Sequence, residues 1–324
     1  MNITLNIPES QLKRVVIVGA GFAGLNLATR LRNKPYQVVL IDKNNFHQFQ
    51  PLYYQVAMAG LEPSSISFPL RKTFQDADNV FIRVAEMEGV DTDQKTLFTS
   101  QGSLKYDHLV LANGAVTNYF NNEEFEKNSY GLKSVGESLT LRNAILTDFE
   151  RSIQISDYDE RQKLIDIAIV GGGPTGVELA GSLAEMRKYI LPKDYKELDS
   201  EEVDIYLIQG MDNLLYGMDP ELGQKAQEYL EGMNVKVMLN TKVVSIKENS
   251  LFTEDGQEII AGKVIWAAGV ACEKVTGLES DKLYGKANRL LVNRFNQVEG
   301  HDEIYAIGDA AMMKTEEYEN GHPQ

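Results

Sequence analysis

Two glycine-rich motifs could hold the phosphate groups of nucleotides. Each follows an apolar stretch, and they read Gly19-Ala20-Gly21-Phe22-Ala23-Gly24 after residues 14–18 and Gly171-Gly172-Gly173-Pro174-Thr175-Gly176 after residues 165–170. The first glycine of such a motif permits a tight turn, the second lets a pyrophosphate approach the backbone, and the third lets a helix pack on the strand. The helix start then binds the phosphates. Two motifs 152 residues apart predict two dinucleotide sites, as in a flavoprotein supplied by a nicotinamide.

The residue that ends the second strand of each half could bind a ribose. Asp42 lies 18 residues after Gly24, at the end of a predicted strand over 37–41, and would accept hydrogen bonds from ribose hydroxyls. The matching strand of the second half, 203–208, ends in Gln209. A carboxylate repels a 2′-phosphate and an amide does not, so the choice between NADH and NADPH stays open. We expect use of both cofactors or weak discrimination.

Two other carboxylates have positions that a cofactor could use. Glu178, two residues after Gly176, is predicted in the first turn of a helix, where the helix dipole stabilises a negative charge. It is either a helix-start charge or a group near the nicotinamide that positions its carboxamide. Asp309 follows Gly308 at the end of a predicted strand over 303–307. In a flavoprotein it would bind the ribityl chain, and the alternative is a simple Gly-Asp turn.

Composition excludes several classes of protein. A net charge of −15 over 324 residues repels the phosphate backbone of nucleic acids. Cys272 is the single cysteine, which excludes a disulfide framework and a redox-active cysteine pair. No apolar run of about 18 residues or more exists, so nothing is expected to span a bilayer, and residues 1–12 lack a signal-peptide core. We expect a cytoplasmic protein. The four histidines lack metal-ligand spacing, so we predict no metal site and interpret them as structural or solvated.

Strand and helix patterns repeat around the two motifs. We predict an α/β fold of two Rossmann-like domains, similar to the two-dinucleotide-binding fold of glutathione reductase. Residues 46–71 are expected to form an irregular excursion with short helical turns. The predicted strands cover 14–18, 37–41, 81–85, 96–99, 108–112, 164–170, 203–208, 235–239, 263–267 and 303–307, and the predicted helices cover 22–32, 135–155, 174–189 and 220–233.

A run after the first strand–helix–strand unit is more specific than any glycine motif. It is Phe49-Gln50-Pro51-Leu52-Tyr53-Tyr54-Gln55-Val56-Ala57, followed by residues 66–71, and it resembles the type II NADH:quinone oxidoreductases, single-subunit enzymes that pump no protons. Residues 264–270 and 304–311 are also similar to blocks of that family, which is part of the FAD- and NAD(P)-dependent pyridine nucleotide oxidoreductases. The resemblance covers nearly the whole chain.

The resemblance implies FAD in the first domain and NADH, or NADPH, in the second. It implies that a hydride passes from the nicotinamide to the flavin and two electrons pass on to a membrane quinone. Glu178 and Gln55 are the implied catalytic residues. The implied FAD residues are Gly19, Gly21, Phe22, Ala23, Gly24, Asp42, Lys43, Gln50, Pro51, Leu52, Ala85, Ala112, Gly114, Gly308, Asp309 and Ala310. The implied NAD(P)H residues are Gly171, Gly173, Pro174, Thr175, Gly176, Glu178, Gln209, Ala268 and Gly269.

The predicted FAD domain is discontinuous, covering 1–135 and 288–324, with the NAD(P)H domain over 136–287. The family resemblance implies a homodimer that is peripheral on the cytoplasmic face of the membrane through C-terminal helices. Since residues 312–324 are polar, we expect that this segment is missing here and that the chain is C-terminally truncated. Two alternatives stay open: an NAD(P)H-dependent reductase of a small iron–sulfur protein, and a non-catalytic NAD(P)H-binding flavoprotein. A sulfide:quinone reductase would need more cysteines.

Overall fold

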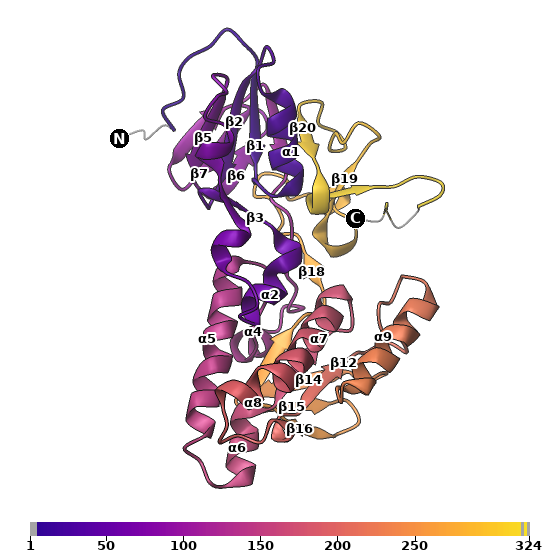
Figure 1. The fold of residues 1–324 in the computed structure, drawn as a ribbon. Coiled ribbons are helices and arrows are strands. Elements are labelled where there is room, and N and C mark those ends of the chain that lie inside the picture. The colour runs from indigo at the N-terminus through magenta and orange to yellow at the C-terminus, as the bar shows by residue number, and fades with distance from the viewer. Residues whose placement is uncertain (1–4, 319–320, 323–324) are drawn as a thin grey trace. The chain divides into compact units, whose positions relative to one another are not determined.

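The computed structural model describes residues 5–318 and 321–322 (Figure 1). The chain forms two compact units: unit 1 contains residues 1–49, 67–116 and 270–324, and unit 2 contains residues 50–66 and 117–269. These limits differ from the predicted domain limits, because residues 50–66 and 117–135 belong to unit 2 and residues 270–287 to unit 1. Residues 1–4 of the predicted polar N-terminus and residues 319–320 and 323–324 of the polar C-terminus lie outside the described residues.

Unit 1 is built on a five-stranded parallel sheet. Its central strand β1 consists almost entirely of buried β-branched residues, as expected for a strand covered on both faces. The sheet order is β20-β9-β1-β2-β5, so the chain crosses over on both sides of β1. The strands are β1 (Arg14–Val18), β2 (Gln37–Asp42), β5 (Val80–Val84), β9 (His108–Leu111) and β20 (Ile304–Ala306), and helix α1 (Phe22–Leu31) connects the first two.

Smaller elements complete unit 1. A three-stranded antiparallel meander, β6 (Met87–Asp91), β7 (Thr96–Thr99) and β8 (Gly102–Lys105), lies between β5 and β9 in the sequence. Unit 1 also contains two separate strand pairs. Strand β3 (Phe46–Gln48) pairs with β4 (Ser67–Pro69), and β19 (Leu290–Val292) pairs with β21 (Ala311–Met313). The short helices are α3 (Leu70–Thr73), η4 (Asp281–Leu283), η5 (Lys286–Asn288) and η6 (Gly308–Ala310).

Unit 2 repeats this plan with a four-stranded parallel sheet and its own meander. The sheet order is β13-β12-β11-β17, and the meander order is β14-β15-β16. The sheet strands are β11 (Ile167–Val170), β12 (Ile205–Ile208), β13 (Lys236–Met238) and β17 (Lys263–Trp266). The meander strands are β14 (Val243–Lys247), β15 (Ser250–Thr253) and β16 (Glu258–Ile260). The two-residue strands β10 (Val116–Thr117) and β18 (Val270–Ala271) lie where the chain passes between the units.

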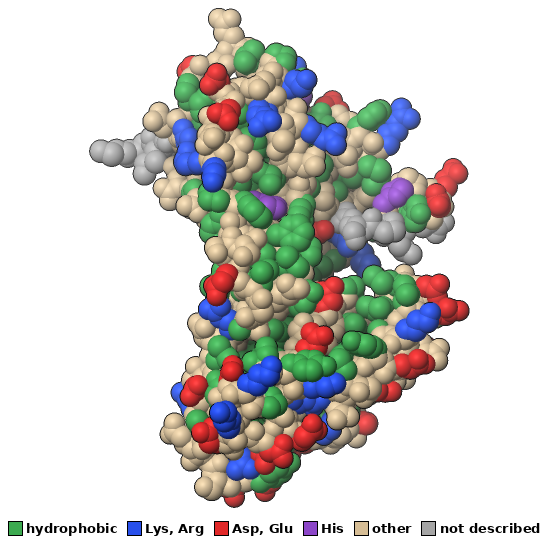
Figure 2. Space-filling view, viewed as in Figure 1, with side chains coloured by type: hydrophobic (Ala, Val, Ile, Leu, Met, Phe, Trp, Pro, Cys, Tyr) green, Lys and Arg blue, Asp and Glu red, His purple; other side chains and the backbone are tan. Residues whose placement is uncertain are grey.

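The helices of unit 2 begin at recognisable caps. Asn122, Ser134, Asp157 and Asp219 accept backbone hydrogen bonds at the starts of α4, α5, α6 and α9. The helices are η1 (Gln50–Leu52), α2 (Tyr53–Ala57), η2 (Pro63–Ser65), α4 (Glu123–Asn128), α5 (Val135–Ser152), α6 (Tyr158–Ile165), α7 (Pro174–Tyr189), α8 (Leu191–Asp194), η3 (Ser200–Glu202) and α9 (Pro220–Gly232). Over the part of unit 2 that α9 forms, Figure 2 shows acidic side chains, in keeping with the chain's negative charge.

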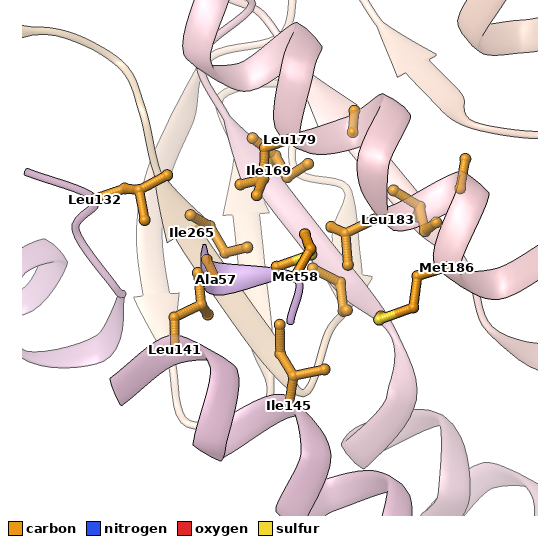
Figure 3. Packing of buried hydrophobic residues seen from close by; sticks show 14 of the residues in the cluster. Ala57, Met58, Leu132, Leu141, Ile145, Ile169, Leu179, Leu183, Met186 and Ile265 are labelled. Carbon is orange, nitrogen blue, oxygen red and sulfur yellow. The ribbon is translucent and has the colours of Figure 1, made fainter. Parts of the chain in front are cut away.

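The core of unit 2 fixes the excursion that follows β3. Ala57 and Met58, at the end of α2, are buried among side chains of α5, α7 and the sheet (Figure 3). Leu141 and Ile145 come from α5, and Leu183 comes from α7. Burial of such apolar side chains stabilises the packing by roughly 1.5–3 kcal/mol each. The family-like run therefore has its helix embedded in unit 2.

Most predicted elements are confirmed to within one or two residues. Strands 14–18 and 96–99 and helix 174–189 have the predicted ends, and residues 46–71 form the predicted excursion of short elements. The strand predicted over 164–170 is wrong at its start, because Leu164 and Ile165 end helix α6 and the strand begins at Ile167. Among the described residues, no helix combines the length and apolar character needed to cross a membrane.

Candidate functional site: two nucleotide cradles

The turn after β1 has room for a ligand at one glycine and none at the other two. Gly19 has a φ of +100°, and its N–H donates to the Ile41 carbonyl at 2.7 Å. A Cβ on Gly19 would lie 2.2 Å from the Ala112 carbonyl oxygen, and one on Gly24 would lie 1.9 Å from the Gly19 carbonyl oxygen. A Cβ on Gly21 would meet nothing within 4 Å. These glycines, with Asp42 and Ala112, form what we call the first cradle.

Asp42 ties the end of β2 to this turn. Its Oδ2 accepts from the Ala20 N–H at 2.7 Å, and its Oδ1 accepts from the Asn44 N–H at 2.7 Å. Its carbonyl accepts from the N–H of Ala85, the residue after β5. Hydrogen bonds to a carboxylate are stronger than those between neutral groups. Each carboxylate oxygen keeps lone-pair capacity beyond these bonds, so the half-buried side chain can also accept from a ligand.

The Gly308–Asp309 pair lies against the start of α1. Gly308 has a φ of +65°, and a Cβ there would lie 2.9 Å from the Cβ of Ala23. Asp309 is half-buried, and its carbonyl accepts from the Cys272 thiol at 3.1 Å. Ala310 is buried. The strand β20 therefore delivers a carboxylate to the same end of the sheet as the glycine turn.

The turn after β11 repeats the pattern in unit 2. Gly171 has a φ of +118°, and its N–H donates to the Ile208 carbonyl at 2.8 Å. A Cβ on Gly171 would lie 2.4 Å from the Ala267 carbonyl oxygen, and one on Gly176 would lie 1.9 Å from the Gly171 carbonyl oxygen. A Cβ on Gly173 would again meet nothing within 4 Å. These glycines, with Gln209 and Ala267, form the second cradle.

Gln209 occupies the place in unit 2 that Asp42 occupies in unit 1. Its Oε1 accepts from the Gly172 N–H at 3.2 Å, and its Nε2 donates to the Asn213 carbonyl at 3.2 Å. The carbonyl of Gly172 accepts from the Leu215 N–H at 2.8 Å. Leu215 has a φ of +52°, a strained value for a leucine. The loop after β12 is therefore fastened to the second glycine turn from both sides.

Helix α7 begins directly at the second cradle. Gly173 is its N-cap residue and Pro174 its first residue, as predicted, with Thr175 exposed beside it. The prediction that Glu178 lies in the first turn is wrong, because the helix starts at Pro174 and Glu178 falls one turn further on. Stabilisation by the helix dipole falls off over that distance. Partial desolvation raises the pKa of Glu178 above its usual range, although the residue is largely exposed.

The family-like run contributes residues of unit 2. Gln50, Pro51 and Leu52 form η1, and Gln55 lies on α2 with its Nε2 donating to the Tyr54 hydroxyl at 3.3 Å. The remaining predicted residues follow strands: Lys43 is exposed after β2, Gly114 has a φ of +69° after β9, and Ala268 and Gly269 follow β17. Gly114 and Gly269 both face open space.

Sequence reasoning missed two contacts that hold the cradles. One is the Leu215 N–H on the Gly172 carbonyl, and the other is the His47 ring on the Ala20 carbonyl. No local pattern marks either contact, since both depend on how a later segment of the chain folds back onto the turn. The meander over 243–260 was also missed, although its Asp255-Gly256 pair is a hairpin signal. Across residues 5–318 and 321–322, no group of three His, Cys, Asp or Glu could hold a metal ion.

Both cradles fit the diphosphate of a dinucleotide. Gly21 and Gly173 each leave open the space that a side chain would fill, beside the first residue of a helix. There the free N–H groups of the first helical turn and the positive end of the helix dipole favour an anion. The first and third glycines cannot be replaced without a clash with backbone, so the turn has one shape.

Comparison with known proteins agrees with this arrangement. Residues 13–324 match the model of the pyridine nucleotide-disulphide oxidoreductase family. The chain is 34% identical over 312 residues to a type II NADH:quinone oxidoreductase, NdhA, of Mycobacterium tuberculosis, covering 93% of this chain and 66% of the relative. It is 31% identical to a type II NADH:quinone oxidoreductase of Haemophilus influenzae, covering 93% of this chain and 74% of the relative.

A solved structure shows the same fold. The NDH2 of Plasmodium falciparum in complex with NADH has a TM-score of 0.87 and 25% identity, covering 94% of this chain and 65% of that one. This chain thus spans about two thirds of the length of the mycobacterial relative and of that solved chain. Fold, cradles and identity lead to one assignment: the chain belongs to the pyridine nucleotide-disulphide oxidoreductase family and, within it, to the type II NADH:quinone oxidoreductases.

Proposed function

We propose that this protein oxidises NADH with a quinone, with FAD in the first cradle and the nicotinamide nucleotide in the second. The observation that carries the proposal is the duplicated glycine turn, open at Gly21 and at Gly173 and closed at the other glycines. The relatives named above as NADH:quinone oxidoreductases support this substrate pair. The chain spans about two thirds of the length of the mycobacterial relative. We therefore propose the NADH:quinone activity for this chain rather than take it over from that relative.

In the first cradle, the N–H groups of Gly21, Phe22 and Ala23 bind the FAD pyrophosphate, and Asp42 binds the adenosine ribose. The bonds from Ala20 and Asn44 to Asp42 support this role, because they orient the carboxylate before the ligand arrives. Asp309 binds the ribityl chain, with Gly308 close to the start of α1. From the family resemblance we also assign to FAD the residues Gly19, Gly24, Lys43, Gln50, Pro51, Leu52, Ala85, Ala112, Gly114 and Ala310.

In the second cradle, Gly173, Pro174 and Thr175 surround the pyrophosphate of NADH. Gln209 faces the adenosine ribose and carries no charge, which supports the use of NADPH as well as NADH. The other residues assigned to this nucleotide are Gly171, Gly176, Ala268 and Gly269.

Glu178 and Gln55 are assigned to the reacting groups. Glu178 accepts a hydrogen bond from the nicotinamide carboxamide and so orients the ring. From the family resemblance we assign Gln55 to the quinone, because its amide can donate to a quinone oxygen. When bound, FAD supplies the redox chemistry, accepting a hydride from NADH and passing two electrons to the quinone.

The family resemblance supports two further proposals, one on assembly and one on membrane association. We propose that the protein forms a homodimer and associates peripherally with the cytoplasmic face of the membrane through C-terminal helices. Each property can be measured separately, dimerisation by sedimentation and membrane association by vesicle flotation.

The first experiment is to purify the 324-residue chain, record its visible spectrum and titrate it with NADH without oxygen. Bound flavin absorbs near 450 nm, and loss of that band on NADH addition is the expected result. A short-tailed quinone is then added, and return of the band with one quinone consumed per NADH is expected. The double variant Gly171→Val and Gly173→Val is the control. It should bind flavin and show the 450 nm band, and that band should persist when NADH is added.

Other outcomes overturn parts of the proposal. Flavin that binds and is never reduced by NADH or NADPH contradicts the oxidoreductase and favours a sensor. Flavin that is reduced and returns its electrons to a small iron–sulfur protein but not to any quinone contradicts the quinone as acceptor. A chain reconstituted with excess FAD that shows no binding contradicts the assignment of the first cradle.

A further inference from the structure

The ring of His47 lies buried beneath the first glycine turn. It is 5% exposed, and its Nδ1 lies 2.8 Å from the carbonyl oxygen of Ala20. A carbonyl oxygen only accepts, so Nδ1 carries the hydrogen and donates it. The function proposed above gives His47 no part, and the sequence predicted only a structural or solvated histidine.

This bond fixes the direction of a phosphate-binding group. The Ala20 carbonyl and the Gly21 N–H belong to one peptide plane, and no described peptide bond is cis. In a trans peptide the C=O and N–H point in opposite directions. Because His47 holds the carbonyl on the buried side, the Gly21 N–H is directed to the opposite side. A Cβ on Gly21 would meet nothing within 4 Å, so the turn has room for a ligand at this residue.

The surroundings of His47 hold the ring in place. His47 lies on β3 and pairs with Phe68 of β4, and the two rings are stacked with centroids 6.4 Å apart. Phe22, the first residue of α1, packs edge-on against the ring with centroids 5.2 Å apart. The imidazole is thus fixed by a strand pair and two aromatic rings, so it can hold the Ala20 carbonyl in one orientation.

The second cradle contains the same device made from backbone. There the Gly172 carbonyl accepts from the Leu215 N–H at 2.8 Å. The N–H of the same residue, Gly172, donates to Gln209. In the first cradle the matching residue is Ala20, whose N–H donates to Asp42 and whose carbonyl accepts from His47. Two turns of one shape, each with a donor on the same carbonyl, indicate that the donor serves the turn rather than the packing of β3 alone.

We propose that His47 is a positioning residue for FAD: its Nδ1–H orients the Ala20–Gly21 peptide so that the Gly21 N–H meets the pyrophosphate. The proposal rests on the proposed function, because it requires FAD in the first cradle. It names a residue outside the glycine motif that sets the affinity of that motif for a diphosphate. His47 does not itself touch the cofactor, so its effect passes through one peptide group.

The test exploits the position of the donating nitrogen. The side-chain nitrogen of asparagine can take the place of Nδ1, whereas that of glutamine reaches the place of Nε2. We therefore expect His47→Ala and His47→Gln to weaken FAD binding about tenfold and His47→Asn to restore most of the loss. The measurement is the dissociation constant of FAD for the deflavinated protein, followed by fluorescence quenching. The ³¹P NMR shifts of the bound pyrophosphate should change in His47→Gln and return in His47→Asn.

The control and the contrary outcomes are distinct. His108 lies in the same unit, at the start of β9, with a buried Nδ1 that has no partner, and His108→Asn should leave the dissociation constant unchanged. If the unchanged chain binds no FAD, the proposed function fails. If it binds FAD and all three His47 variants bind equally well, or if asparagine and glutamine weaken binding alike, the inference about His47 is overturned.

Discussion

The two cradles have the same arrangement of glycines. They differ in the groups that bind the residue after the first glycine, which is Ala20 in the first turn and Gly172 in the second. In the first, a carboxylate holds the Ala20 N–H at 2.7 Å and an imidazole holds its carbonyl at 2.8 Å. In the second, a carboxamide holds the Gly172 N–H at 3.2 Å and a backbone N–H holds its carbonyl at 2.8 Å. The glycines are set by steric limits, whereas the groups that hold the residue after the first glycine differ between the two turns.

This difference is one of charge more than of shape. A carboxylate forms a shorter and stronger bond to an N–H than an amide does, and it also adds a negative charge beside the turn. If the two cradles bind nucleotides as proposed, the carboxylate of the first disfavours a 2′-phosphate and the amide of the second does not.

The largest expected effect comes from filling the third glycine of either turn. A Cβ on Gly24 or Gly176 would lie 1.9 Å from a backbone oxygen, which forces the helix away from the strand. Overpacking of this kind costs about 3 kcal/mol. We expect Gly24→Ala to abolish FAD retention, and Gly176→Ala to keep the flavin and lose its reduction by NADH. Absorbance at 450 nm before and after NADH addition measures both.

Gly181 provides the matched control for these two variants. It lies on α7, and a Cβ there would be 3.9 Å from its nearest neighbours, an ordinary contact. In a helix interior, alanine is more stable than glycine by roughly 1 kcal/mol. Gly181→Ala should therefore retain flavin and its reduction by NADH, with a slightly higher melting temperature. If Gly176→Ala behaves like Gly181→Ala, the second turn does not bind the nucleotide as proposed.

The next effect tests the charge difference itself. Gln209→Glu places a carboxylate where the first cradle has one, and it should repel the 2′-phosphate of NADPH. We expect kcat/KM for NADPH to fall about tenfold or more relative to that for NADH, measured by steady-state kinetics with each cofactor. Gln224→Glu, an exposed change of the same charge on α9, should alter neither. Equal losses with both cofactors would contradict the role of Gln209.

The glycine turns could be predicted from sequence, and their fastening could not. Gly19 and Gly171 follow buried strands and precede helices, so their roles follow from spacing alone. The contacts of His47 and Leu215 depend instead on a strand and a loop that return to the turn from outside the motif. Helix α6 was missed because its polar sequence lacks a strong apolar period and adjoins a strand. Local sequence patterns thus predict those parts of the structure whose shape is fixed by steric limits.

A smaller effect is expected from Glu178 on α7. If it orients the carboxamide, Glu178→Ala should slow the reduction of flavin by NADH several-fold without loss of flavin, as measured by stopped-flow absorbance. Because desolvation raises the pKa of Glu178, the reduction rate should vary with pH above the ordinary range of a glutamate, and Glu178→Gln should remove that variation. Glu185→Ala, an exposed change on the same helix, is the control. Unchanged kinetics would make Glu178 a surface charge.

The smallest expected effect concerns the other end of the unit 2 sheet. Asp166 is buried before β11, and burial raises its pKa to about 7, although a hydrogen bond from the Asp204 N–H opposes the rise. The unfolded carboxyl loses its proton near 3.8, so between 3.8 and about 7 the folded state binds more protons. Stability should therefore fall as the pH rises through this window and level off above it.

Asp166→Asn keeps an acceptor for the Asp204 N–H and removes the charge that burial disfavours. We expect the variant and the original chain to melt alike near pH 4, and the variant to melt about 5 °C higher at pH 8. Asp159→Asn, an exposed change on α6, should show no such growing difference. A difference that is constant with pH would mean that the Asp166 carboxyl is ionised throughout and held by its hydrogen bond. The amino-terminal edge of this sheet would then resemble the first cradle, where Asp42 serves as an acceptor.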